Sequence, residues 1–126
     1  MARARSLLSV ASRVLAVAAA LALALAGCGV GGAVSRTIGA RCDRSDECDD
    51  RCLPPGPVFP GGFCSVSCES STDCPSDASC ADLEAGVCLF DCRDDGECEF
   101  LGPGWRCLEA VLRDDVTRGV KVCLGG

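Results

Sequence analysis

The stretch CESSTDCPSDASCADLEAGVCLFDC, residues 68–92, decides the fold, because its cysteine spacing belongs to a pattern that the chain uses three times. Reading outward from it gives three groups of four: Cys42-x5-Cys48-x3-Cys52-x11-Cys64, Cys68-x5-Cys74-x5-Cys80-x7-Cys88 and Cys92-x5-Cys98-x8-Cys107-x15-Cys123. The groups start 26 and 24 residues apart, and each opens on C-x5-C with an acid just before the second cysteine. The sequence therefore predicts a cysteine-rich domain, residues 41–126, made of internal repeats at 42–64, 68–88 and 92–123.

The N-terminal region has the parts of a bacterial secretion signal. Arg3, Arg5 and Arg13 form a basic segment, and the apolar run VLAVAAALALALA follows over residues 14–26. This run has the length of a signal-peptide core and is too short to span a bilayer, for which a helix needs about 20 residues. We therefore expect residues 1–27 to be a helical signal peptide that is removed on export.

The signal ends in Leu25-Ala26-Gly27-Cys28, which resembles a bacterial lipobox. The resemblance implies that Cys28 receives a diacylglyceryl group, that the chain is cut before it, and that the new N-terminus is acylated by a fatty acid such as palmitate. Two or more acyl chains anchor a protein stably in a lipid bilayer. The alternatives are an ordinary signal peptide with a chance cysteine, or an uncleaved anchor. Because Gly29 and not Asp follows Cys28, the resemblance to known sorting rules favours the outer membrane or cell surface.

Residues 28–40 join this anchor to the cysteine-rich domain. They contain four glycines and show no apolar periodicity. Such a composition is typical of a flexible tether or of a disordered terminus. We expect a tether that lifts the first repeat off the membrane.

The repeats contain twelve of the thirteen cysteines, an even number, in a chain that carries an export signal. Disulfides are the expected state of cysteines in an oxidising compartment. Zinc is the alternative, because the C-x3-C pair Cys48/Cys52 comes near zinc-ligand spacing. The expected disulfide residues are Cys42, Cys48, Cys52, Cys64, Cys68, Cys74, Cys80, Cys88, Cys92, Cys98, Cys107 and Cys123. Four cysteines allow three pairings in each repeat, and the spacing leaves the pairing open.

The coarse structure within each repeat is a polar x5 loop followed by a hairpin. The third and fourth cysteines flank a turn, and short apolar or β-branched runs surround it, which is typical of a β-hairpin. In the first repeat the turn is a longer, proline-rich loop over residues 53–63 that cannot be regular strand. Residues 109–113 could instead form one helical turn. The fold class is thus small and disulfide-rich, with short hairpins and little regular secondary structure.

The spacing C-x5-C-x5-C-x7-C-x3-C over residues 68–92 is similar to the N-terminal cysteine-rich domain of Dickkopf proteins, and to tandem four-cysteine repeats of extracellular lipoproteins in myxobacteria-like bacteria. The resemblance implies crossed bonds, first to third and second to fourth. Repeat three departs from it through two lengthened gaps. On this chain the implied pairs are Cys42–Cys52, Cys48–Cys64, Cys68–Cys80, Cys74–Cys88, Cys92–Cys107 and Cys98–Cys123. Receptor binding by Dickkopf proteins does not transfer, because sites do not follow from fold.

Composition narrows the function. Without residues 1–27 the chain has nine basic and 18 acidic residues, a net charge of −9, which argues against nucleic acid and anionic lipid headgroups as partners. Few large apolar side chains are present, so the disulfides are expected to replace most of a core. There is no histidine, and disulfides would consume any cysteine nucleophile, so we expect no enzyme. The acid pairs 49–50, 94–95 and 114–115 are expected to be solvated loop acids rather than a glycosidase pair.

We expect no cofactor and no metal site, with one weak possibility. Five acids crowd the first repeat, which could suit a weak extracellular calcium site, although EF-hand spacing is absent. They are Asp43, Asp46, Glu47, Asp49 and Asp50.

The third repeat is the most apolar part of the domain, and Phe100 and Trp105 are its aromatic residues. They pack as a small core or form an exposed patch for an envelope or extracellular protein or glycan, with Trp105 as its anchor. The expected function is a non-catalytic binding, adhesion or structural module, lipid-anchored in the cell envelope. The alternative is a disulfide-rich inhibitor of a secreted hydrolase that uses the rigid loop 53–63.

Overall fold

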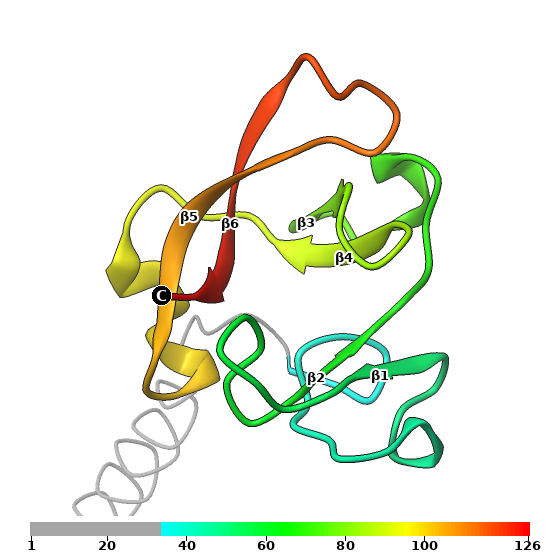
Figure 1. Ribbon diagram of the computed structural model, residues 1–126, viewed down its shortest axis with the longest axis vertical. Helices are drawn as coiled ribbons and strands as arrows, with labels where there is room; N and C mark the ends of the chain where they lie inside the picture. The colour runs from blue at the N-terminus through cyan, green and yellow to red at the C-terminus, as the bar shows by residue number, and fades with distance from the viewer. Residues whose placement is uncertain (1–33) are drawn as a thin grey trace, which may run out of the picture. The chain divides into compact units, whose positions relative to one another are not determined.

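The computed structural model describes residues 34–126; the expected signal peptide, residues 1–27, and Cys28 lie outside the described residues. The described chain forms three antiparallel hairpins, each preceded by a short 3-10 helix (Figure 1). No helix among the described residues is long and apolar enough to cross a membrane. In chain order the elements are η1 Ser45–Glu47, β1 Arg51–Leu53, β2 Phe63–Ser65, η2 Ser71–Asp73, β3 Ala78–Ala81, β4 Val87–Phe90, η3 Asp95–Leu101, β5 Trp105–Val111 and β6 Gly119–Gly125.

The three sequence repeats fold into the same motif. In the first two repeats the first and second cysteines flank the 3-10 segment, and in the third Cys98 lies within η3. In all three repeats the third and fourth cysteines lie directly opposite each other on the two strands of the hairpin. These opposed pairs are Cys52↔Cys64, Cys80↔Cys88 and Cys107↔Cys123. A hairpin is therefore present in all three repeats. The x5 loops of the first two repeats each contain a three-residue 3-10 turn, and in the third the 3-10 helix continues beyond the loop to Leu101.

Two crossed disulfides fasten each 3-10 segment to its hairpin. The first cysteine bonds the third and the second bonds the fourth, as the resemblance implies: Cys42–Cys52, Cys48–Cys64, Cys68–Cys80, Cys74–Cys88, Cys92–Cys107 and Cys98–Cys123. The bonds join residues 10 to 25 positions apart. Closing a loop of this length stabilises the folded state by about 3 kcal/mol in the chain-entropy model.

The acid before the second cysteine has the same structural role in every repeat. Its carboxylate accepts a hydrogen bond from the backbone N–H of the residue that follows the first cysteine, over 2.6 to 2.9 Å. The acids are Glu47, Asp73 and Glu97. Asp73 also accepts the N–H of Ser70, and these backbone hydrogen bonds lower its pKa. The acid that marks the repeat in the sequence therefore closes the C-x5-C loop, because it satisfies a backbone donor that no regular structure pairs.

The alternative of a helical turn at residues 109–113 is wrong. Residues Trp105–Val111 form β5, which pairs along its whole length with β6, from Trp105↔Gly125 to Val111↔Gly119. The pairing places Glu109 opposite Lys121, an opposite-charge pair that favours the sheet. A helical turn at these positions would break the hydrogen bonds between β5 and β6 and leave the backbone groups of β6 without partners.

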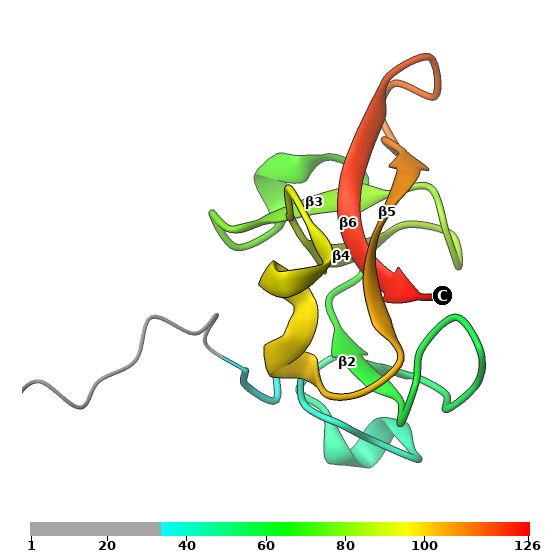
Figure 2. The same ribbon diagram turned by 90° about the vertical axis from the view of Figure 1, so that its left-hand side faces the viewer.

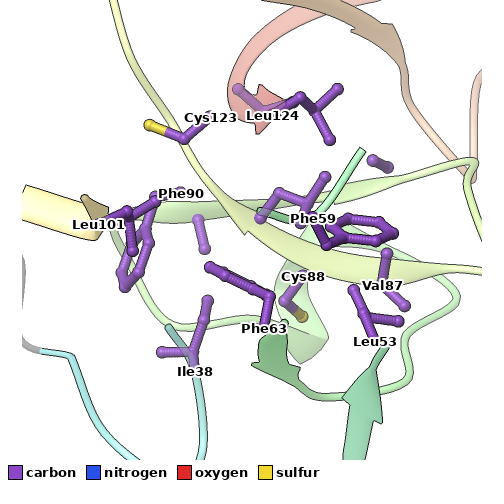
Figure 3. Packing of buried hydrophobic residues seen from close by; sticks show 14 of the residues in the cluster. Ile38, Leu53, Phe59, Phe63, Val87, Cys88, Phe90, Leu101, Cys123 and Leu124 are labelled. Atoms are coloured by element: carbon purple, nitrogen blue, oxygen red, sulfur yellow. The ribbon is translucent and has the colours of Figure 1, made fainter. Parts of the chain in front are cut away.

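The three repeats share one hydrophobic core, whereas the sequence led us to expect disulfides in place of most of a core. Each hairpin is too small to bury its own apolar face, so the faces pack against one another. Phe63 of β2 lies among Ile38, Phe90 and Cys88 (Figure 3), and its ring is 5.3 Å from that of Trp105. Backbone bonds also cross between repeats, among them Cys88 N–H to Val66 O and Arg113 N–H to Cys80 O.

The predicted tether, residues 28–40, is wrong for its described part. Residues 34–40 form a turn that packs on the domain, and Ile38 is 3% exposed within the core. The N–H of Gly39 donates to the carbonyl of Cys64, whose own N–H donates to Ala40. The composition of the segment suggested a linker because its apolar residues follow no helical or strand periodicity. A single isoleucine and two backbone hydrogen bonds are nevertheless enough to dock so short a segment on the domain.

Candidate binding surface

The cysteines of the described residues are all joined in disulfides, so their sulfurs are not thiolates available to a metal. Three Sγ atoms gather within 4.8 Å in each repeat, for example those of Cys92, Cys98 and Cys123. This closeness follows from the crossed disulfides, because the two bonds of each repeat end on opposed strand positions. Zinc requires deprotonated, unbonded thiols, so the disulfides exclude the zinc interpretation of these residues.

The acids of the first repeat do not converge on one point. Glu47 accepts the N–H of Asp43, and Asp50 accepts the N–H of Ser67. Asp49 accepts the Thr37 hydroxyl, while Asp46 faces Arg44 at 3.4 Å. Among residues 34–126 the clusters of three or more possible ligand atoms consist of cysteine sulfurs alone. Four carboxylates therefore have separate partners, and they do not form the convergent oxygen cage that calcium binds.

The acid pairs also have structural partners. Asp95 accepts the backbone N–H of Cys107 at 2.9 Å and pairs with Arg106 at 3.1 Å, which holds η3 against β5. Asp115 accepts both the N–H and the hydroxyl of Thr117, and these hydrogen bonds lower its pKa. Carboxylates whose pKa is lowered remain ionised at neutral pH and cannot act as a general acid there.

Trp105, which the sequence left as either a core residue or an exposed anchor, is buried. Its side chain is 5% exposed and packs on Phe63, and its indole N–H donates to the carbonyl of Pro60 at 3.1 Å. Of the two alternatives, the packed core is therefore correct for Trp105, and the exposed anchor is wrong. The sequence offered no way to choose, because the residue that covers Trp105 comes from the first repeat.

The proline-rich loop between β1 and β2 docks on the third repeat. Phe59 is 5% exposed, and Val58 O accepts the N–H of Gly125. A methyl group on Gly125 would overlap the carbonyl of Pro57, so the glycine permits this close approach. Residues 54–58 stay exposed between fixed ends. The loop is therefore irregular and held at both sides, as its prolines predicted.

The distal half of the β5–β6 hairpin carries the two most exposed large apolar side chains of the third repeat. Val111 is 41% exposed on β5, and Val116 is 60% exposed in the turn. The turn is ordered by Asp115, whose carbonyl accepts the N–H of Arg118, and Leu112 N–H donates to Arg118 O. We call the exposed side chains of Val111 and Val116 the hairpin tip. The apolar residues of repeat three that the sequence marks include Val111 but not Val116, although the lengthened gaps point to this hairpin.

Arg113 fastens the base of the hairpin tip to the second repeat. Its guanidinium contacts Asp82 at 2.7 Å and Glu69 at 3.7 Å. The hydrogen bond to Asp82 raises the pKa of Arg113. Asp82 N–H in turn donates to Val111 O, so one residue of the second repeat holds both a side chain and the backbone of the hairpin.

Phe100, the second aromatic residue expected at a contact surface, is exposed. It is 36% exposed at the end of η3, and its ring lies 5.2 Å from that of Phe90 in an edge-to-face arrangement. Val34 lies near the same buried ring. A methyl group built on Gly39 would be 2.7 Å from Phe90 Cε2 and 3.5 Å from Val34 Cγ2. Phe100 and Val34 therefore form a second apolar site, distinct from the hairpin tip.

Comparison with known proteins finds no matching family model, no matching curated protein and no matching solved structure.

Proposed function

We propose that this chain is a lipid-anchored extracytoplasmic binding module, without catalytic activity, that presents the hairpin tip to a protein partner. The observation that carries the proposal is the complete pairing of the cysteines. Twelve of the thirteen cysteines bond among themselves, so none of the twelve is a disulfide partner for Cys28. Disulfides in this number are typical of exported domains, which is the compartment that lipidation at Cys28 requires.

The use of the carboxylates supports a non-catalytic role. Several of the candidate acids, among them Glu47, Asp95 and Asp115, serve as acceptors for backbone amides, as ion-pair partners or as turn caps. The described residues contain no histidine. General acid–base chemistry needs a group whose pKa lies near the working pH. A domain that uses its carboxylates for folding is better suited to binding than to such chemistry.

The chemistry of the hairpin tip favours a protein over a glycan. Glycan sites depend strongly on exposed aromatic faces, and Trp105 offers none because Phe63 and Pro60 cover it. Val111 and Val116 are aliphatic; Val111 ends β5, and Val116 lies in the turn that Asp115 preorganises. An ordered apolar tip loses little entropy on binding, which favours affinity for an apolar pocket of a protein partner.

The anchor is tested by mass spectrometry of the protein purified from membranes without reduction. We expect Cys28 at the N-terminus with diacylglyceryl and acyl mass added, and six intact disulfides. Cys28→Ala should shift the protein from the membrane fraction to the soluble fraction without changing the disulfide map. An unmodified Cys28, or an intact segment 1–27 in the purified protein, would refute the anchor.

Presentation of the hairpin tip is tested by cross-linking to envelope proteins in the producing cell. The variant Val111→Ser/Val116→Ser should lose the captured partner that the native protein cross-links specifically. Val58→Ser is the matched control, since Val58 is 47% exposed on the first repeat and should leave capture unchanged. Equal capture by all three proteins would remove the hairpin tip from the proposal.

The inhibitor alternative has one specific observation in its favour, which is the loop 54–58. Its tip is exposed while Leu53 and Phe59 on either side are buried, so the loop is preorganised. Inhibitors that occupy an active site gain affinity from such rigidity. Assays of the full domain against a panel of secreted proteases test this alternative; inhibition that Val58→Asp abolishes would support it over the binding module, and no inhibition at micromolar concentration would reject it.

A further inference from the structure

A second surface of the domain faces the start of the described chain, and it differs from the hairpin tip in position and chemistry. It consists of Val34, 46% exposed, and Phe100, 36% exposed. Both lie against the buried ring of Phe90, Phe100 directly and Val34 across Gly39. We call this pair the entry patch, because Val34 is the first described residue.

The length of chain before Val34 limits what the entry patch can face. Six residue steps separate Cys28 from Val34, and six residues span at most about 20 Å at full extension. The tether expected from sequence would have been twice as long, but residues 34–40 pack on the domain and do not contribute to its reach. A lipid on Cys28 therefore holds Val34 within about 20 Å of the bilayer, whatever the conformation of the residues between.

We infer that the entry patch rests in the polar–apolar boundary of the bilayer that holds the Cys28 lipid. This inference depends on the proposed lipid anchor and adds the orientation of the domain to it. Apolar side chains with nearby cations bind at this boundary, where the rings enter the acyl region and the charges remain among headgroups. Phe100 supplies the ring and Val34 supplies a smaller apolar contact.

The charge around the entry patch agrees with this orientation, although the domain as a whole is acidic. Residues 34–41 contain Arg36 and Arg41 and no acid. Arg36 pairs with Asp49 at 3.6 Å, so Arg41 is the cation of this segment on which the orientation depends. Arg41 extends over Gly102, one position beyond Leu101 and two beyond Phe100. Glu99 is the opposing charge next to Phe100. The net charge of −9 disfavours recruitment to anionic headgroups, so the covalent lipid must recruit the protein and the entry patch only orients it.

The same orientation directs the hairpin tip outward. The turn between β5 and β6 projects at the far end of the domain from the cyan segment at residue 34, in Figure 1 and in the perpendicular view of Figure 2. A domain that rests on the entry patch therefore presents Val111 and Val116 away from the membrane.

The test uses the lipidated chain in phosphatidylcholine vesicles that contain a lipid with a photoreactive group in its upper acyl chain. After illumination, peptide mapping should place most protein cross-links on residues 34–41 and 95–101 and few on 112–118. Phe100→Ser should reduce the cross-links at 95–101 severalfold. Val116→Ser is the matched control, a substitution of an exposed apolar residue at the far end, and should leave the pattern unchanged.

The outcomes separate the two proposals. Lipid on Cys28 with cross-links spread over the domain, concentrated at 112–118 or unaffected by Phe100→Ser would overturn the orientation and leave the anchor intact. An unmodified Cys28 in the mass spectrum would overturn both. An unchanged non-reducing disulfide map for Phe100→Ser shows that lost cross-links come from the patch and not from misfolding.

Discussion

The hairpins β3–β4 and β5–β6 carry the same crossed disulfides but occupy different environments. The strands of the second repeat have four residues each, and every residue of β4 is buried. The strands of the third repeat have seven residues each, and most of β5 is exposed or half-buried. One motif therefore provides the centre of the domain in one copy and a projecting element in the next.

The difference separates a constant part of the repeat, which we call the frame, from a part whose length varies. The two disulfides and the acid of the C-x5-C loop recur in all three copies. Most of the added length lies beyond the opposed cysteines, between Cys107 and Cys123, where the hairpin leaves the core, and the rest lies between Cys98 and Cys107. Extra residues at that point lengthen the hairpin without disturbing the frame, because the two disulfides fix the base of the hairpin.

The largest expected effect is a loss of stability on removal of a disulfide, and it should differ between the second and third repeats. Cys68→Ala/Cys80→Ala removes a bond with both ends buried and should lower the free energy of unfolding by about 4 kcal/mol. Cys92→Ala/Cys107→Ala, where Cys107 is half-buried, should have a smaller effect. Chemical denaturation without reductant measures both. The loop-entropy model alone predicts the larger loss of stability for Cys92→Ala/Cys107→Ala, since Cys92–Cys107 closes the longer loop. A larger loss for that variant would therefore contradict the comparison.

The next effect compares leucines on the two hairpins. Leu89 of β4 is fully buried, and Leu89→Ala should cost about 3 kcal/mol of stability, because the cavity left in a shared core cannot collapse. Leu108 of β5 is 36% exposed, and Leu108→Ala should cost less than about 1 kcal/mol. Thermal unfolding of both variants makes the comparison. Equal losses would mean that β5 is packed as tightly as β4.

A smaller effect probes the contact between the first and third repeats. Trp105→Phe keeps the ring against Phe63 but removes the hydrogen bond to Pro60, and should cost about 1 kcal/mol. Limited proteolysis should also cut the loop 54–58 faster, since Pro60 loses one of its attachments. An unchanged cleavage rate would show that Phe59 and Val58 hold the loop without the indole.

The repeats, the hairpins and the fold class could be predicted because they depend on residues that are close together in the sequence. The spacing of four cysteines, the acid at Glu47, Asp73 and Glu97, and the turn residues all lie within one repeat. The pairing needed a resemblance to known repeats, since spacing alone allows three connectivities. Even so, the role of the acid stayed hidden, because a backbone acceptor and a solvated loop acid look the same in sequence.

The candidate site was predicted less well because its members depend on contacts between repeats. Trp105 is buried by Phe63 and Pro60, which lie more than 40 positions earlier in the chain. Ile38, which precedes the first repeat, packs in the core with Phe63 of the first hairpin and Phe90 of the second (Figure 3). For Phe100 the sequence also left core and surface open, and the structure places it near the end of η3 with its side chain 36% exposed.

The smallest effect tests whether the shared acid belongs to the frame, at Asp73 of the second repeat. Hydrogen bonds from the N–H groups of Glu69 and Ser70 lower the pKa of Asp73 in the folded state. A carboxylate with a lowered folded pKa adds stability that is present above its ordinary pKa and is lost as the pH falls through the folded value. The native protein should therefore lose part of its thermal stability between neutral pH and about pH 2.

Asp73→Asn should be slightly less stable at pH 7 and should lose less on acidification, because an amide oxygen accepts more weakly and does not titrate. Asp114→Asn is the matched control, since Asp114 is exposed and its side chain accepts no hydrogen bond within residues 34–126. Melting temperatures at neutral and acid pH under non-reducing conditions give the comparison. If Asp73→Asn and the native protein lose the same amount on acidification, the acid marks the repeat in sequence without fastening its loop, and the disulfides alone define the frame.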